Sequence, residues 1–330
     1  MKRNIILAAS AAAVLLTLAS CGSRKAALLP NVSGKAGEVL AVIEREQWEG
    51  DLGTEIRDVL SKDCPYLAQR EPLFNVSNVP GGSFTNMFKV HRNILICNIN
   101  PQLQEPGVLY RHDQWARPQA VVQINAVDED EAVEFFRQDG DRIAEFFEQA
   151  ERDRIIDNAK LYEAREFLEP VARLSGGVLH FPSGYKLKKD SEDFIWTADD
   201  KQYVYQDVLI FRYPASGEGD FEDKTLLGNI NRTLKDNVPG MFENTYMTIS
   251  TAIEPAFTSL SYKGRNFMQV RGFWEVENDY MGGPFVAHAF YSRDGKDIIV
   301  LYAFVYAPRY DKRRYLRQVE SLLYSFEWKD

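Results

Sequence analysis

Six residues of this 330-residue chain have the side-chain types of a molecular recognition surface. Arginine and aromatic side chains dominate recognition surfaces because they combine large contact areas with directional hydrogen bonds. The structural alternative is that Phe273 packs in the core, Trp274 covers a sheet edge and the nearby Gly-Gly-Pro sequence turns a hairpin. The candidate ligand or partner surface consists of Trp115, Arg117, Arg271, Trp274, Asp279 and Tyr280, and the structural alternative stays open beside it.

The sequence lacks the familiar catalytic motifs. No two of its four histidines are four residues apart, and H-E-x-x-H, G-x-S-x-G, C-x-x-C and the glycine-rich phosphate loops do not occur. We therefore expect no cofactor, no metal and no catalytic residue. The alternative is a periplasmic hydrolase of unrecognised type that uses carboxylates or one of His112, His180 and His288.

The N-terminus has the pattern of a cleaved export signal. Lys2 and Arg3 precede an apolar run over 5–19, which at 1.5 Å per residue is too short to span a bilayer core of about 30 Å. The run ends in Leu-Ala-Ser-Cys21, which resembles the bacterial lipobox. We expect residues 1–20 to be a lipoprotein signal peptide and Cys21 to be lipidated. The alternative is an ordinary secretory signal with a chance cysteine.

Acyl chains on Cys21 would hold the chain on a membrane, since each buried methylene contributes about 0.8 kcal/mol. Residues 21–36 contain Pro30 and Gly34 and are expected to form a lipidated tether. No aspartate follows Cys21, and no acidic run resembles a surface-export signal. We expect an outer-membrane lipoprotein whose body faces the periplasm, with surface exposure or the inner membrane as less favoured alternatives.

The acidic net charge of the chain argues against a nucleic-acid partner. The net charge is −9, and it becomes −11 without residues 1–20, which hold Lys2, Arg3 and no acidic residue. A nucleic-acid binder would usually be basic, so no nucleic-acid partner is expected. The expected partners are the membrane, through the acyl chains on Cys21, and an unknown envelope protein or small ligand.

Cys64 and Cys97 are the other two cysteines. In an oxidising periplasm they could form one disulfide. The alternative is that Cys97, which ends the apolar run Ile-Leu-Ile-Cys, is a buried strand thiol.

Hydrophobic periodicity predicts an α+β fold with two modules, each a largely antiparallel sheet packed with helices. The N-terminal module, 37–175, contains predicted strands and a long helical segment over 128–169 that could kink at Gly140. The charged stretch 148–154 of this segment is expected to be a solvated face. The predicted strands of this module are 38–43, 84–90, 93–99 and 120–126.

The C-terminal module, 176–330, has more strand signals and ends in a helix over 312–324. The last strands are expected to form an antiparallel set, with an Asp-Gly hairpin turn at 294–295. The basic cluster of Arg309, 312–314 and Arg317 is expected to be a solvated helix face, with contact to lipid headgroups as the alternative.

Several short sequences resemble those of a family of uncharacterised bacterial envelope lipoproteins. The resemblance covers nearly the whole mature chain and implies no catalytic residues, because the family has no established activity. Residues 178–330 are also weakly similar to Mog1/PsbP-type α+β sandwiches, a fold that commonly serves in binding or assembly. We thus expect a non-enzymatic binding or assembly module of the cell envelope. The family-like sequences are WARPQ (115–119), ERDRII (151–156), MGGPF (281–285), FVYAP (304–308) and LRQVES (316–321).

Overall fold

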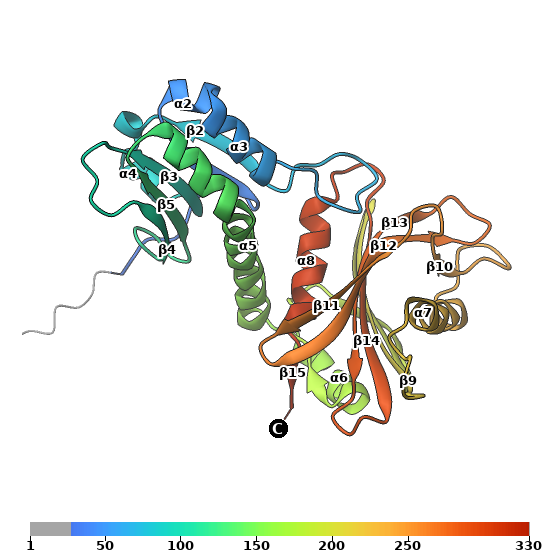
Figure 1. Ribbon diagram of the computed structural model, residues 1–330. Helices are drawn as coiled ribbons and strands as arrows, with labels where there is room; N and C mark the ends of the chain where they lie inside the picture. Colours follow the sequence, from blue (N-terminus) through green and yellow to red (C-terminus); the bar gives the residue numbers. More distant parts are fainter. Residues whose placement is uncertain (1–27, 330) are drawn as a thin grey trace, which may run out of the picture.

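The computed structural model describes residues 28–329 and contains two α+β modules that share one long helix (Figure 1). The predicted fold class is therefore confirmed. The predicted signal peptide and Cys21 lie outside the described residues. Within 28–329, no helix is long and apolar enough to cross a membrane.

The N-terminal module is built on a five-stranded sheet in the order β2-β1-β3-β5-β4. Three of its four pairings are parallel and only β4 runs antiparallel to β5, whereas antiparallel pairing had been expected in both modules. Parallel neighbours need crossover connections, which α3 and α4 help to supply here. The elements are β1 (Glu38–Val42), α2 (Arg45–Glu49), α3 (Asp51–Leu60), β2 (Asn75–Val79), α4 (Asn86–Lys89), β3 (Asn93–Ile99), β4 (Gly107–His112) and β5 (Ala120–Ala126).

The strand predicted over 84–90 is wrong. The structure has the short helix α4 there, preceded by a 3₁₀ turn over Gly81–Ser83. Phe84 and Phe88 are four residues apart, a spacing that also fits one face of a helix, and both pack with Trp115 on the outer face of the sheet. Two aromatic residues therefore gave an ambiguous pattern in this short segment.

Helix α5 (Glu129–Leu161) runs unbroken through both modules. Asp128 caps its start, where the carboxylate Oδ1 accepts a hydrogen bond from the Glu131 amide at 2.9 Å. No break occurs at Gly140, where an added Cβ would lie 3.0 Å from Val59 Cγ2 of α3. The glycine thus allows two helices to approach closely, and the C-terminal part of α5 enters the core of the next module through Ile156 and Ala159.

The C-terminal module is an eight-stranded antiparallel sheet in the order β10-β12-β13-β14-β9-β8-β7, with β11 paired to β12. Helices α6 and α8 pack on one face and α7 on the other (Figure 1). Helix α6, which lies before the predicted boundary at 176, packs on β8 and β9 of this sheet. The elements are α6 (Leu168–Ser175), β6 (Gly177–Val178), β7 (Lys186–Asp190), β8 (Phe194–Lys201), β9 (Val204–Pro214), α7 (Asp223–Asn237), β10 (Met247–Ile249), β11 (Ala256–Tyr262), β12 (Arg265–Val276), β13 (Gly282–Tyr291), β14 (Asp297–Tyr306), α8 (Arg313–Tyr324) and β15 (Glu327–Trp328).

The basic start of α8 joins the two modules and is not the solvated face expected from the sequence. The buried carboxylate of Glu71, in the N-terminal module, accepts hydrogen bonds from the amides of Lys312 at 2.7 Å and Arg313 at 2.8 Å. Arg317 donates to the carbonyl of Leu73 at 3.0 Å. A carboxylate is favoured at a helix N-terminus, where backbone N–H groups point outward. The contact therefore clamps α8 to the loop before β2.

The charged stretch 148–154 of α5 is likewise partly buried, contrary to expectation. Glu151 is 0% exposed and accepts hydrogen bonds from Arg92 at 2.9 Å, Asn93 at 2.8 Å and Arg154 at 3.0 Å. Arg154 also donates to the Pro118 carbonyl at 3.0 Å, and burial lowers the pKa of its guanidinium to about 10. This network fixes α5 to the start of β3.

The last part of the predicted tether, 21–36, is hydrogen-bonded to the N-terminal module. The Arg117 amide donates to the Pro30 carbonyl at 2.8 Å, and the Ser33 amide donates to the Val90 carbonyl at 2.8 Å. The chain is therefore bonded to the N-terminal module from Pro30 onward.

Candidate functional site

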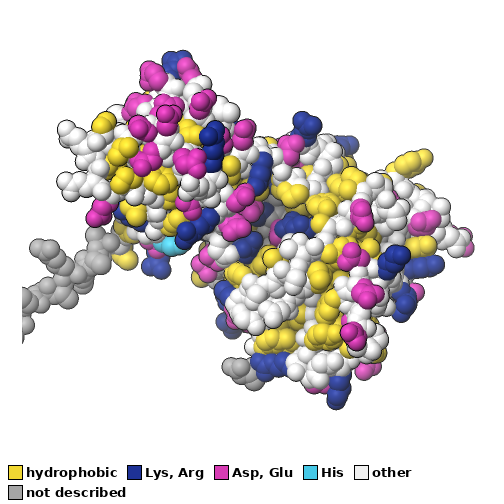
Figure 2. All heavy atoms as spheres, viewed as in Figure 1, with side chains coloured by type: hydrophobic (Ala, Val, Ile, Leu, Met, Phe, Trp, Pro, Cys, Tyr) yellow, Lys and Arg dark blue, Asp and Glu magenta, His cyan; other side chains and the backbone are white. Residues whose placement is uncertain are grey.

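A hollow of about 740 Å³ lies between the two modules. Its floor comes from β11, β12 and α8, and its outer wall comes from α5 and β4; we call it the front groove. Figure 2 shows basic and acidic side chains gathered where the two modules meet. The groove thus combines charged groups with the aromatic side chains of Tyr110, Phe146, Tyr262, Phe267 and Tyr324.

The polar groups of the groove floor satisfy one another. Arg271 forms an ion pair with Glu320 of α8, and its Nε donates to Gln269 Oε1 at 2.9 Å. The amide Nε2 of Gln269 lies 3.0 Å from the Tyr324 hydroxyl and 3.2 Å from His288 Nε2. The charges of the floor therefore largely cancel, and its side chains are held in fixed positions.

The α5 wall presents a guanidinium that lacks a carboxylate partner. Arg152 lies 3.9 Å above the Tyr324 ring and donates to Gln149 Oε1 at 2.6 Å, and no ion pair joins it to an acidic residue within the described part of the chain. Gln149 also donates to the Tyr262 hydroxyl at 3.0 Å, which bridges the groove from α5 to β11. Glu145 is exposed on the same wall. The groove thus offers aromatic rings beside one guanidinium, Arg152, and one carboxylate, Glu145, neither of which forms an ion pair with a described residue.

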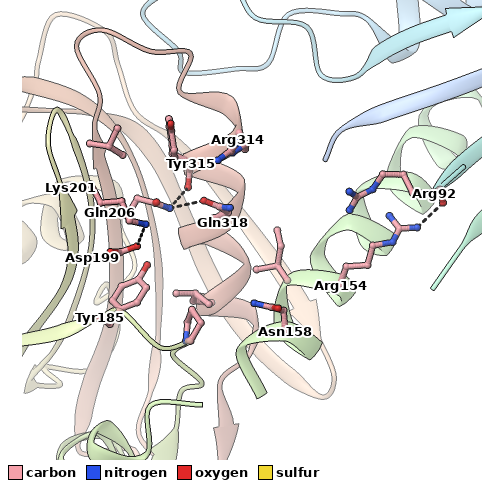
Figure 3. Close-up of a pocket in the computed structure, with 14 residues that line it drawn as sticks. Arg92, Arg154, Asn158, Tyr185, Asp199, Lys201, Gln206, Arg314, Tyr315 and Gln318 are labelled. Atoms are coloured by element: carbon pink, nitrogen blue, oxygen red, sulfur yellow. Dashed lines mark hydrogen bonds and ion pairs between the residues drawn. The ribbon is translucent and has the colours of Figure 1, made fainter. Parts of the chain in front are cut away.

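A second hollow, of about 470 Å³, lies on the other side of the α5–α8 contact. Figure 3 shows Arg92 and Arg154 on one wall, across the gap from Gln206 and Gln318. Both arginines are bonded to Glu151, and the two glutamine side chains are joined by a hydrogen bond of 2.9 Å. These groups therefore have little remaining capacity for an anionic ligand.

A third hollow, of about 180 Å³, contains the buried carboxyl group of Asp207, which is not among the residues predicted from the sequence. Asp207 is 1% exposed; its Oδ2 accepts hydrogen bonds from Trp196 Nε1 at 2.7 Å and Lys188 Nζ at 3.1 Å, whereas Oδ1 has no partner. Burial raises the pKa of Asp207 to about 7, against the opposing effect of the Lys188 cation. An aspartate inside the apolar run of β9 was the available signal.

We expect Asp207→Asn to remove a pH dependence of stability. Below about pH 4 the Asp207 carboxyl is protonated in both the folded and the unfolded chain. Between about pH 4 and 7 it is ionised only in the unfolded chain. The free energy of unfolding of the wild type therefore falls as the pH rises through this range. The variant should gain on the order of 4 kcal/mol relative to wild type over this range. Urea unfolding at pH 4 and 8 measures the difference. Asp200→Asn removes a neighbouring carboxylate that also raises the pKa of Asp207, so this variant should reduce the wild-type slope without abolishing it.

The six residues predicted to form one recognition surface lie in four separate places. Arg271 lies on the floor of the front groove. Trp274 is 3% exposed on the opposite face of the sheet, where its Nε1 donates to the Val305 carbonyl at 3.2 Å. Residues three apart on a strand face opposite ways, so Arg271 and Trp274 do not form one surface.

The other four predicted residues lie away from the groove. Trp115 is half-buried and packs edge-on against Phe84 at 5.6 Å, and Arg117 is exposed and paired with Asp113 at 3.2 Å. Asp279 and Tyr280 lie in the turn between β12 and β13, where the Tyr280 side chain is fully exposed. The structure therefore brings none of these four to Arg271.

The histidines do not form an acid–base site in any of the three hollows. His288 is 0% exposed among aromatic rings, and burial, aided by neighbouring arginines, lowers its pKa. His180 bonds to Glu163 outside the hollows, and His112 is exposed beside Phe146. Within 28–329, no group of three or more His, Cys, Asp or Glu side chains is placed to hold a metal ion.

The disulfide that Cys64 and Cys97 could have formed is absent, and both thiols are free. Cys64 lies at the module junction near Arg271 and Arg317, whereas Cys97 lies on β3 against the N-terminal core. The two cysteines therefore lie in different parts of the structure, and their spacing in the sequence could not show this separation.

We expect both thiols to react slowly in the folded protein. Burial raises the pKa of Cys64 to about 11 and that of Cys97 to about 12, so at pH 8 only about one Cys64 side chain in a thousand is a thiolate. Iodoacetamide labelling followed by peptide mapping should modify both only after unfolding. A peptide linked through Cys64 and Cys97 would contradict this expectation.

Comparisons with known proteins give a family model for each module. Residues 168–325 match a domain of unknown function, DUF4837, and residues 32–160 match another domain of unknown function, DUF8532. No curated protein matches the chain. Among solved structures, the lipid transfer and protein localization domain of human StarD13 (DLC2) is 11% identical over 44% of this chain and 89% of its own, with a TM-score of 0.22. That similarity is too low to establish a common fold, and the Mog1/PsbP resemblance stays a prediction. Each of the two modules thus matches a domain family whose function is unknown.

Proposed function

We propose that this chain is a membrane-anchored lipoprotein of the bacterial envelope that binds a protein or ligand in the front groove and performs no bond-making chemistry there. The observation that carries the proposal is the groove itself, because both modules build its walls and buried charge networks hold those modules together. Binding sites that are formed in advance lose less freedom when a ligand binds.

The composition of the groove supports recognition rather than catalysis. Its aromatic rings provide apolar contact area, and its polar side chains lie at fixed positions that can orient a ligand. The Arg271 and Glu320 charges neutralise each other, so neither is poised to exchange a proton with a substrate.

Cys21 supplies the proposed anchor, with the body in the periplasm at the outer membrane. Nine residues, 22–30, separate it from the first backbone hydrogen bond to the body, so the anchor would lie at most about 30 Å from that point. Labelling with an acyl-chain analogue in cells should mark the wild-type chain and not Cys21→Ala. Equal labelling of both would contradict the anchor.

A pair of matched variants tests whether the partner or ligand binds in the front groove. Thr258→Trp fills it from β11, whereas Asn266→Trp adds the same bulk to the opposite, exposed face of the same hairpin. After crosslinking in intact cells, the tagged wild type and Asn266→Trp should capture the same partner or ligand, and Thr258→Trp should capture at most a tenth as much. Equal capture by both variants would place the binding surface elsewhere.

Acid–base chemistry at Asp207 is the second candidate function. The raised pKa and the unpartnered Oδ1 in a hollow of about 180 Å³ favour it. Lys188 is the titratable group in contact with this carboxyl, and hydrolysis would need a second acid or base. If Asp207→Asn abolished the cellular role of the chain while partner capture persisted, this candidate would replace the binding proposal.

A further inference from the structure

The two long edges of the C-terminal sheet differ in how well they are protected against the addition of another strand. At one edge, β7 has the sequence Lys-Leu-Lys-Lys-Asp and an irregular register against β8. Lysines and irregular pairing of this kind prevent another strand from adding to a sheet edge. The edge strand β11 has the sequence Ala-Phe-Thr-Ser-Leu-Ser-Tyr, with no charge, no proline and regular register over its whole length. Strand β11 is therefore an open edge.

The turn after β11 shows which backbone groups point outward. Lys263 and Gly264 both have positive φ and join the closing pair Tyr262 and Arg265, as in a two-residue type I′ hairpin. The closing pair of such a hairpin is hydrogen-bonded, and bonded and non-bonded pairs alternate along the strands. The outward N–H and C=O groups thus belong to Phe257, Ser259 and Ser261. No hydrogen bond from another described segment reaches them.

The open edge borders the front groove. The side chains of Thr258 and Leu260 face the groove, since they lie opposite the groove-lining residues Gln269 and Phe267 of β12, and Tyr262 on the same face of β11 also lines it. Helix α5 forms the far wall, and Figure 1 shows it running past β11. An added strand would place every second side chain against the aromatic side chains of the groove and near the positive charge of Arg152.

We propose that β11 receives an extended segment of a partner protein by strand addition, with alternate side chains of that segment in the front groove. This proposal rests on the proposed binding function and specifies the partner. The matching segment is extended, lacks proline in its central residues, carries apolar side chains at alternate positions and has an acidic side chain for Arg152. A second copy of this chain is disfavoured, because its sheet would need the space between β11 and α5.

A phage-displayed library of random 12-residue peptides, selected against the full-length chain in detergent, supplies the probe. Ser259→Pro removes one outward N–H and keeps the bonds to β12, because proline is tolerated where a strand N–H faces solvent. Selected peptides should bind Ser259→Pro at least tenfold more weakly than wild type. Ser259→Ala, which keeps the N–H, should bind as wild type does, and Arg152→Ala should weaken peptides that contain an acidic residue.

Each of the other possible outcomes would overturn a different part of the proposal. Equal binding to Ser259→Pro, combined with loss of binding in Thr258→Trp, would overturn strand addition and leave the groove as the binding site. Binding unaffected by both variants would overturn the proposed function as well. A wild-type dimer that Ser259→Pro dissociates would show that a second copy occupies the edge and would overturn the partner assignment.

Discussion

Glu151→Ala should lower the free energy of unfolding by about 3–5 kcal/mol, the largest single effect that we expect in this protein. The side chain of Glu151 is 0% exposed and compensates Arg92 and Arg154, whose side chains are 15% and 9% exposed. Its removal leaves two nearly buried guanidinium groups without a counter-charge. Urea unfolding of the full-length chain, followed by circular dichroism, measures the loss.

Glu145→Ala is the matched control for this prediction. Glu145 lies on the same helix, is exposed and forms no ion pair with a described residue, so its removal should change stability by less than about 0.5 kcal/mol. If the two variants were equally stable, Glu151 would not be the centre of a buried charge network.

Glu71→Ala should cause the second largest loss of stability, about 2–3 kcal/mol, together with looser docking of the two modules. The variant removes a buried acceptor from the Lys312 and Arg313 amides at the start of α8. Removal also leaves the positive end of that helix facing basic side chains without a carboxylate. Unfolding measurements give the stability, and small-angle scattering should show an increased radius of gyration.

Asp63→Ala provides the comparison for Glu71→Ala. Asp63 forms an ion pair in the preceding segment of the same loop, where it and Arg70 are largely exposed at 59% and 92%. Exposed pairs contribute little to stability, so this variant should match the wild type in both measurements. An unchanged scattering profile for Glu71→Ala would show that other contacts suffice to hold the modules together.

Local sequence patterns predicted most elements of the C-terminal module. The apolar runs of β13 and β14 and the amphipathic pattern of α8 correspond closely to the structure. These signals are short-range, because the period of apolar residues depends only on the local element. The helical period also places Gly140 inside a helix. Its contact with Val59 could not be predicted, because that contact depends on how helices α3 and α5 pack.

The buried charges could not be predicted, because their partners are distant in the sequence. Arg92 is 59 residues from Glu151, and Glu71 is 241 residues from the Lys312 amide. A charged helix segment with unknown partners is normally solvated, and both segments were interpreted in that way. The sequence contains the charges but does not show which element covers them.

The candidate site was predicted only in part for the same reason. Arg271 was selected and does line the front groove, whereas Trp274 was assigned to the same surface although it lies on the other face of β12. The remaining walls come from β4, α5, β11 and α8, which meet only after both modules have docked. Asp207 could have been found from its position within an apolar strand.

Site-specific photocrosslinking in intact cells tests the central claim, that the front groove is the binding surface. A benzophenone amino acid at Thr258 faces the groove, and the same group at Asn266 lies on the opposite face of the hairpin. We expect a discrete crosslinked product from Thr258 that is absent from Asn266. The same products from both positions, or none from Thr258, would contradict it.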